Sequence, residues 1–277
     1  MAKTSGSDET GQTMADRIAD LITDTAVNAP RSLQKRIGPS GVGNPCSRAL
    51  AYHQLDWPQP SARQEVIAPV IGTGFHGWME EAFQRRQTAM PDGRPRYRIE
   101  ERVTVRPHPI EARIVAGSSD LYDRLSRTVW DWKLVGKSSL EKYRRSGPGE
   151  QYRIQAHLYG LGQENGGEQP QRVAICFVGR YHELIVHVWT EPYDRQVALD
   201  ALARLDAITD QCTPPDDGRH DPYDTAFFAQ FPTSELAKCR FCEWFKPGSA
   251  DLAVGCPGIT KTEDRPARHG FESLIAA

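Results

Sequence analysis

Residues 117–134, GSSDLYDRLSRTVWDWKL, contain the pattern that decides the predicted fold. Two runs typical of β-strands, 113–121 and 128–134, are separated by a short polar turn, which allows them to pair as a hairpin. Strands are also predicted over 97–106, 173–179 and 183–189, and helices from Met14 and over 47–55, 65–87, 137–145, 150–163 and 192–211. Strands with helices before and after them predict an α/β fold with a mixed central sheet.

Acidic and basic side chains share one face of this predicted hairpin. Alternation along the second strand places Asp131 and Lys133 on the same face and Trp132 on the other. Asp120 lies beside Asp131 if the two strands pair. Carboxylates and an ammonium are costly to bury because each loses hydration, and a divalent cation between the carboxylates would balance the charge. Oxygen ligands favour Mg²⁺ or Mn²⁺ over Zn²⁺. The alternative is a solvated hairpin face whose charged residues are simply exposed.

Two predicted helices carry further polar side chains that fit such a site. His76 lies in the segment GTGFH, and its imidazole could complete a metal site begun by the two aspartates. Tyr152, Gln155 and Tyr159 recur at spacings of three and four residues, so they share a helical stripe that could orient the lysine or contact DNA. The alternatives are an ordinary polar contact for the histidine and a core stripe for the tyrosines.

Four of the six cysteines form a candidate metal-binding set. Cys239 and Cys242 are spaced as C-x-x-C, Cys256 follows further on, and Cys46 is the best-placed remote fourth ligand. Four thiolates can hold Zn²⁺ or a [4Fe–4S] cluster, and the spacing does not separate these two. The other two cysteines are interpreted as buried structural residues: Cys176 in a strand and Cys212 at a helix end.

Composition excludes several classes of protein. The chain has 277 residues, 39% of them hydrophobic, and a net charge of −2, which is typical of one or two globular domains and is neutral about nucleic acid. We expect no membrane span and no signal peptide, and reduced thiols in the cytoplasm. Gly136-Lys137-Ser138 resembles the end of a P-loop, but Asp131 replaces the glycine that this motif needs, so ATP hydrolysis is not expected.

Organisation along the chain follows from the same patterns. We expect a disordered tail over 1–13, one domain over 14–257 and a C-terminal tail over 258–277. The breaker-rich stretch 38–45 is expected to form a loop. The helix over 65–87 is expected to carry its apolar stripe on or near four residues: Val66, Val70, Trp78 and Phe83.

In their order, these motifs resemble the RecB-like exonucleases of the PD-(D/E)XK superfamily that carry an iron–sulfur cluster. That group includes the CRISPR-associated adaptation nucleases and their phage relatives. NPCSR around Cys46 is similar to the first cysteine motif of the family, and GTGFH to its helix histidine. GSSD and DWK resemble its two acidic motifs, YRIQAHLY its Gln-x-x-x-Tyr helix, and the last three cysteines its remaining cluster ligands.

The resemblance implies a PD-(D/E)XK nuclease-like α/β fold in which cysteine-rich segments join the N- and C-terminal parts around a [4Fe–4S] cluster. It implies a Mg²⁺- or Mn²⁺-dependent DNA exonuclease, acting on single-stranded ends in recombination, repair or spacer processing. The implied metal ligands are His76, Asp120, Asp131 and the main-chain carbonyl of Trp132. The implied catalytic set adds Lys133, which would position or activate the attacking water. It also adds Gln155 and Tyr159, which would support Lys133 and the DNA strand. The implied cluster ligands are Cys46, Cys239, Cys242 and Cys256.

Two other functions stay open. A DNA-binding or processing subunit with a zinc or iron–sulfur module would work with a separate recombinase, helicase or adaptation complex, and it would not need Lys133. A restriction endonuclease would share the catalytic core but does not predict the four cysteines. A homo-oligomer is compatible with each of these functions.

Overall fold

A five-stranded sheet in the order β1-β2-β3-β4-β5 forms the centre of the molecule. The computed structural model describes residues 11–29, 36–60, 66–181, 183–213 and 223–259. The strands are β1 (Tyr97–Arg106), β2 (Val115–Asp123), β3 (Thr128–Val135), β4 (Arg172–Gly179) and β5 (Val186–Pro192). The first three form an antiparallel meander, β4 lies parallel to β3, and β5 is antiparallel to β4. The predicted α/β fold with a mixed sheet is confirmed.

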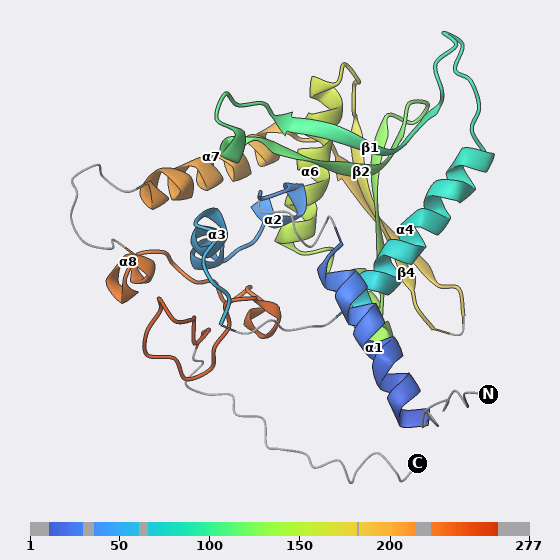
Figure 1. Ribbon diagram of the computed structural model, residues 1–277. Helices are drawn as coiled ribbons and strands as arrows, with labels where there is room; N and C mark the ends of the chain where they lie inside the picture. The colour runs from blue at the N-terminus through green and yellow to red at the C-terminus, as the bar shows by residue number, and fades with distance from the viewer. Residues whose placement is uncertain (1–10, 30–35, 61–65, 182, 214–222, 260–277) are drawn as a thin grey trace, which may run out of the picture.

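Helices cover both faces of this sheet (Figure 1). α4 (Ile67–Arg85) packs on one face, and α6 (Glu150–Asn165) packs on the other with α7 (Arg195–Cys212) against it. Parallel strands need a crossover, and α5 (Lys137–Ser146) and α6 provide it between β3 and β4. Other described helices are α1 (Gly11–Val27), α2 (Pro39–Val42), α3 (Ser47–Gln54) and α8 (Thr225–Ala229), with 3₁₀ turns η1 (Glu111–Arg113) and η2 (Cys239–Phe241).

Alternation along β3 divides its side chains between two cores. Val129 belongs to the large core that includes α6 and α7, whereas Trp132 belongs to a smaller core on the α4 face. There the Trp132 ring stacks on Phe83 of α4 at 5.5 Å between centroids. Because both faces are covered, β4 is apolar and buried after its first residue, Arg172, which is typical of a parallel strand covered on both sides.

The apolar face of α4 differs from the predicted stripe. Phe83 packs on the sheet as expected, but Val70 and Trp78 are 44% and 63% exposed. The residues that join Phe83 are Phe75 and Met79, at spacings of four. Residues four apart lie on one face of a helix, so Phe75, Met79 and Phe83 form a continuous apolar stripe. This stripe packs on the sheet, and the face with Val70 and Trp78 stays exposed.

Several element boundaries also differ from the prediction, and three of them have a clear physical reason or consequence. α1 begins at Gly11, inside the stretch expected to be a tail, and the rest of that stretch lies outside the described residues. One helical turn, α2, forms within the predicted loop because Pro39 supplies the backbone angle and lacks the N–H that a first turn leaves unpaired. β5 runs three residues later than predicted, because Ile185 accepts a hydrogen bond from Gly179 and closes the turn.

The predicted C-terminal tail lies outside the described residues from 260 onward. Cys176 and Cys212 are both buried, in β4 and at the end of α7, as the sequence predicted. Among the described helices, none combines the length and apolar character needed to cross a bilayer.

Candidate functional site

A pocket of about 680 Å³ opens where β1, β2 and β3 lie between α4 and α6. It is lined by every residue predicted for the catalytic site: His76, Asp120, Asp131, Trp132, Lys133, Gln155 and Tyr159. It is also lined by Glu100, which the sequence reasoning missed. We call this site the acidic pocket.

His76, Glu100 and Asp120 form one tight group in the acidic pocket. His76 Nδ1 lies 3.3 Å from Glu100 Oε1 and 3.5 Å from Asp120 Oδ1. One ligand atom from each of the three residues lies within 4.8 Å of the others, which is close enough to bind a common metal ion. Burial lowers the pKa of His76, but its hydrogen bonds to Asp120 and Glu100 outweigh burial and raise that pKa to about 10. Without a metal, a proton on His76 therefore offsets part of the negative charge of the two carboxylates.

Glu100 reaches this group because the backbone of β1 reverses its facing there. Tyr97 and Ile99 pack on the α4 face, whereas Val103 and Val105, although also at odd positions, pack on the α6 face. Glu100 has a φ of 47°, in the left-handed region that side chains other than glycine rarely adopt. Residues from both sides of the sheet therefore meet at this point.

The sequence carried one faint signal of this reversal. Apolar residues occupy the odd positions of RYRIEERVTVR on both sides of Glu101, which is itself charged. A charge at an apolar position of a strand marks a place where the strand leaves its regular face.

Asp131 and Lys133 share a face of β3, as alternation predicted. Lys133 Nζ lies 2.6 Å from Asp131 Oδ2, and Asp131 Oδ1 accepts a hydrogen bond from Gln155 Nε2 at 2.8 Å. The hairpin also brings Asp120 beside this pair, because its Oδ2 accepts the main-chain N–H of Trp132 at 2.7 Å. Burial raises the pKa of Asp131 above its ordinary value, and Lys133 opposes that shift.

Tyr152 and Tyr159 take different positions on α6. The Lys133 ammonium lies 4.9 Å from the centre of the Tyr152 ring, so the ring stabilises the lysine by a cation–π contact. Tyr159 lines the pocket near Gly117, where a Cβ would lie 3.4 Å from the tyrosine hydroxyl and 2.8 Å from Pro39. Gly117 therefore permits the close approach of α2 to β2 at the pocket rim.

The four predicted cluster cysteines line a second pocket, of about 230 Å³, which we call the cysteine pocket. Cys46 precedes α3, and Cys239 begins η2 with Cys242 directly after it. The backbone of Cys256 forms an isolated parallel β-bridge with that of Phe245. No three of these sulfur atoms lie within 4.8 Å of one another, although all four residues are described. The structure thus gathers the four predicted cysteines around one cavity.

Aromatic packing brings the two ends of the chain together at the cysteine pocket. Tyr52 of α3 stacks on Trp244 at 5.5 Å between ring centroids and donates a hydrogen bond to the carbonyl of Leu252 at 2.5 Å. Arg48 contacts the sulfur of Cys256 at 3.6 Å. Burial raises the pKa of the Cys242 thiol to about 11. In the absence of a bound metal, burial therefore favours the neutral thiol of Cys242.

The ring of Tyr152 links the two pockets, because it contacts one lysine from the lining of each. Lys238, directly before Cys239, places its ammonium 5.8 Å from the centre of the Tyr152 ring that also contacts Lys133. The cysteine segment and the acidic pocket therefore meet at Tyr152.

No protein-family model matches the chain, and no curated protein matches its sequence. Among solved structures, it is similar to an alkaline exonuclease from Laribacter hongkongensis, with a TM-score of 0.44 and 11% identity, covering 70% of this chain and 92% of that one. It is also similar to a phage-related exonuclease from Haemophilus somnus 129PT, with a TM-score of 0.40 and 12% identity, covering 64% of this chain and 92% of that one. What the present chain does is therefore inferred from the chemistry of its own residues.

Proposed function

We propose that this chain is a metal-dependent nuclease that hydrolyses phosphodiester bonds in DNA, acting as an exonuclease on single-stranded ends. The observation that carries the proposal is the acidic pocket, in which the group of His76, Glu100 and Asp120 lies beside the ion pair of Lys133 and Asp131. The choice of DNA, of single strands and of ends follows the resemblance of the motifs to RecB-like exonucleases.

The donors in the acidic pocket fit a divalent cation. Three of them lie within 4.8 Å of one another, and the buried Oδ2 of Asp131 contacts Lys133 but accepts no hydrogen bond from the described residues. Carboxylate oxygens with one imidazole suit Mg²⁺ or Mn²⁺, which would polarise a phosphate and lower the pKa of a bound water. We propose His76, Glu100, Asp120, Asp131 and the carbonyl of Trp132 as the residues that hold it.

The remaining side chains of the acidic pocket would prepare the attack on phosphorus. Lys133 would orient the attacking water and stabilise the negative charge that develops on the phosphate. Gln155 holds Asp131 by a hydrogen bond, which keeps the carboxylate turned toward the lysine. Tyr159 lies at the pocket wall, where its hydroxyl would contact the DNA strand.

Basic residues next to the pocket would attract the DNA backbone. Residues 133–153 contain six lysines and arginines against two glutamates, a balance of +4. Lys137, Lys142, Arg144 and Arg145 are all exposed on α5, the helix that directly follows β3. Binding of phosphates by such residues releases the counterions condensed on DNA. This release is less favourable at high salt, so the DNA affinity should fall as salt rises.

For the cysteine pocket we propose a [4Fe–4S] cluster with a structural role. Four cysteines around a cavity of about 230 Å³ support a site for a bound group, and the choice of an iron–sulfur cluster over zinc follows the resemblance of the motifs. Cys46, Cys239, Cys242 and Cys256 would hold it as thiolates. Such a cluster would join the segment before α3 to the C-terminal segment. A brown protein with broad visible absorbance is expected, and a colourless protein containing zinc would contradict this part.

The main test uses purified full-length chain and end-labelled single-stranded DNA with Mg²⁺, Mn²⁺ or EDTA. Progressive shortening from an end in Mg²⁺ or Mn²⁺, and none in EDTA, is the expected result. Binding without cleavage in either metal would contradict the proposal and would favour the DNA-binding subunit. The ion pair of Lys133 with Asp131 in the pocket favours the enzyme, because simple binding does not require a half-buried lysine beside a candidate metal site.

A further inference from the structure

The strained residue Glu100 needs neighbours that hold its backbone. A φ of 47° is disfavoured for a residue with a side chain, and such a conformation persists only where surrounding contacts fix it. Glu100 lies within β1 between Ile99 and Glu101, which pair with Leu121 and Ser119 of β2, so a relaxed strand would restore the regular alternation. The Glu100 carboxylate would then leave the face on which it meets His76.

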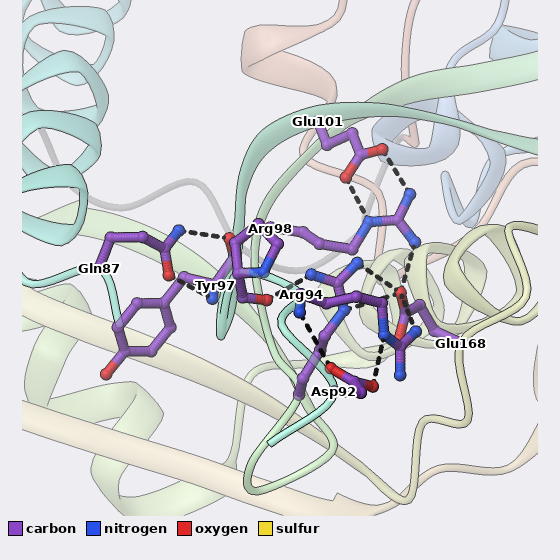
Figure 2. Close-up of polar contacts among 9 residues, drawn as sticks. Gln87, Asp92, Arg94, Tyr97, Arg98, Glu101 and Glu168 are labelled. Carbon is purple, nitrogen blue, oxygen red and sulfur yellow. Dashed lines mark hydrogen bonds and ion pairs between the residues drawn. The ribbon is translucent and has the colours of Figure 1, made fainter. Parts of the chain in front are cut away.

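An ion pair spans the distorted position. Arg98 donates from both Nε and Nη2 to the two carboxylate oxygens of Glu101, as Figure 2 shows. In a regular strand, side chains three residues apart lie about 10 Å apart and point to opposite faces, so they cannot form a two-pronged pair. The pair between Arg98 and Glu101 therefore fits the irregular backbone at Glu100.

A buried carboxylate anchors this ion pair to the rest of the fold. Glu168, whose side chain is 8% exposed, lies between α6 and β4 and contacts Arg98 Nη1 at 3.3 Å. Arg124, after β2, donates to the same carboxylate from Nε at 2.9 Å and from Nη2 at 2.7 Å. Figure 2 shows Arg98 between Glu101 and Glu168. The guanidinium of Arg98 is therefore fixed from both sides.

We propose that Arg98, Glu101 and Glu168 are positioning residues of the acidic pocket, which hold the strained backbone of β1 so that Glu100 meets His76 and Asp120. This inference rests on the proposed function, because it treats Glu100 as a metal ligand. Among the described residues, none of these three side chains hydrogen-bonds a candidate metal ligand, so their effect on metal binding would pass through the backbone of Glu100.

The test measures Mn²⁺ binding to the full chain by electron paramagnetic resonance, without DNA. We expect Glu101→Gln to weaken Mn²⁺ binding roughly tenfold, which is the scale of losing a group that orients a ligand. Asp92→Asn is the matched control: it removes a carboxylate from the same cluster, but Asp92 pairs with Arg94 and not with Arg98. This control should keep wild-type Mn²⁺ affinity.

A double-mutant cycle separates positioning from a general effect on the fold. If Glu101 acts through Glu100, then Glu101→Gln should have little further effect on Mn²⁺ affinity in a Glu100→Gln background. An equal loss in both backgrounds, or wild-type affinity in Glu101→Gln, would overturn the inference. If Glu101→Gln does not fold, the same cycle is run with Arg98→Lys, which keeps the charge but loses the two-pronged pair. Absence of Mn²⁺ binding by the wild-type chain would instead refute the proposed metal site, and the inference with it.

Discussion

The acidic pocket and the cysteine pocket are assembled in different ways. In the acidic pocket the ionisable groups already pair with one another, His76 with Glu100 and Asp120, and Lys133 with Asp131. Its residues come from neighbouring strands and from the two helices that cover them. The cysteine pocket instead joins one residue before α3 to a segment near the other end of the chain, and its sulfurs stand apart around a cavity.

The two pockets therefore obtain their shapes from different contacts. Internal ion pairs and a covered sheet hold the acidic pocket, so we expect it to keep its geometry when metal is removed. Aromatic packing of Tyr52 and Trp244 supports the cysteine pocket, but a bound group would add a direct link between distant segments. Removing metal should therefore stop catalysis at the first pocket and lower stability at the second.

The largest expected effect is on catalysis and comes from Asp120→Asn. The amide can still accept the N–H of Trp132, but it loses the charge that a metal ligand needs. DNA cleavage should fall by at least about a thousandfold while DNA binding, measured by fluorescence anisotropy, stays near wild type. A cleavage rate within a few-fold of wild type would remove Asp120 from the active site.

Lys133→Ala should have the next largest effect. The cleavage rate should fall by roughly a hundredfold or more, which is the scale of losing a group that assists proton transfer or stabilises developing charge. Mn²⁺ binding should remain, since the group of His76, Glu100 and Asp120 is untouched. A normal rate would mean that the lysine only neutralises Asp131.

For the cysteine pocket, Cys46→Ser should lower iron content and the melting temperature, the latter by roughly 10 °C or more, because metal-binding energy at such a site is also folding energy. Cys212→Ser is the matched control, since Cys212 is equally buried but lies outside the pocket. Iron per chain and thermal unfolding give the two readouts. Full iron in Cys46→Ser with iron loss in Cys212→Ser would reverse the assignment.

The proton on His76 predicts that Mn²⁺ affinity at the acidic pocket depends on pH. Its folded-state pKa of about 10 lies above the ordinary value, so this proton stabilises the metal-free chain below about pH 6.5, and the contribution is lost as pH rises toward 10. Mn²⁺ must displace the proton, so its affinity should rise about tenfold per pH unit between pH 7 and 9. Titrations at several pH values should show a shallower slope in His76→Asn, and an unchanged slope would exclude His76 as a ligand.

The smallest expected effect concerns Tyr152, where the two pockets meet. Tyr152→Leu removes the ring that faces Lys133 and should lower the cleavage rate about five- to tenfold, whereas Tyr152→Phe keeps the ring and should retain most activity. The comparison is made on kcat at saturating DNA. Equal losses in both variants would assign the effect to the hydroxyl instead.

Sequence pattern predicted most of the strands and helices because side-chain alternation and helical periods are local properties of the chain. It also placed Asp131, Lys133 and Gln155 correctly, since a two-residue repeat and a helical spacing fix which side chains share a face. The buried side of α4 was only partly predicted: two apolar stripes were available, and contact with the sheet selected the one containing Phe75 and Met79.

By itself, the sequence determined the mixed sheet, the aspartates and lysine of β2 and β3, and the set of cysteines that line one pocket. Tertiary structure alone decided that Glu100 joins the acidic pocket, because its reversed backbone is fixed by Arg98 and by Glu168, a residue from beyond α6. It also decided that Cys46 and Cys256 lie on the same cavity, because Tyr52 packs on Trp244. The physical reason is the same in both cases: a local pattern sets which face a side chain takes, but long-range contacts set where the chain bends and what it meets.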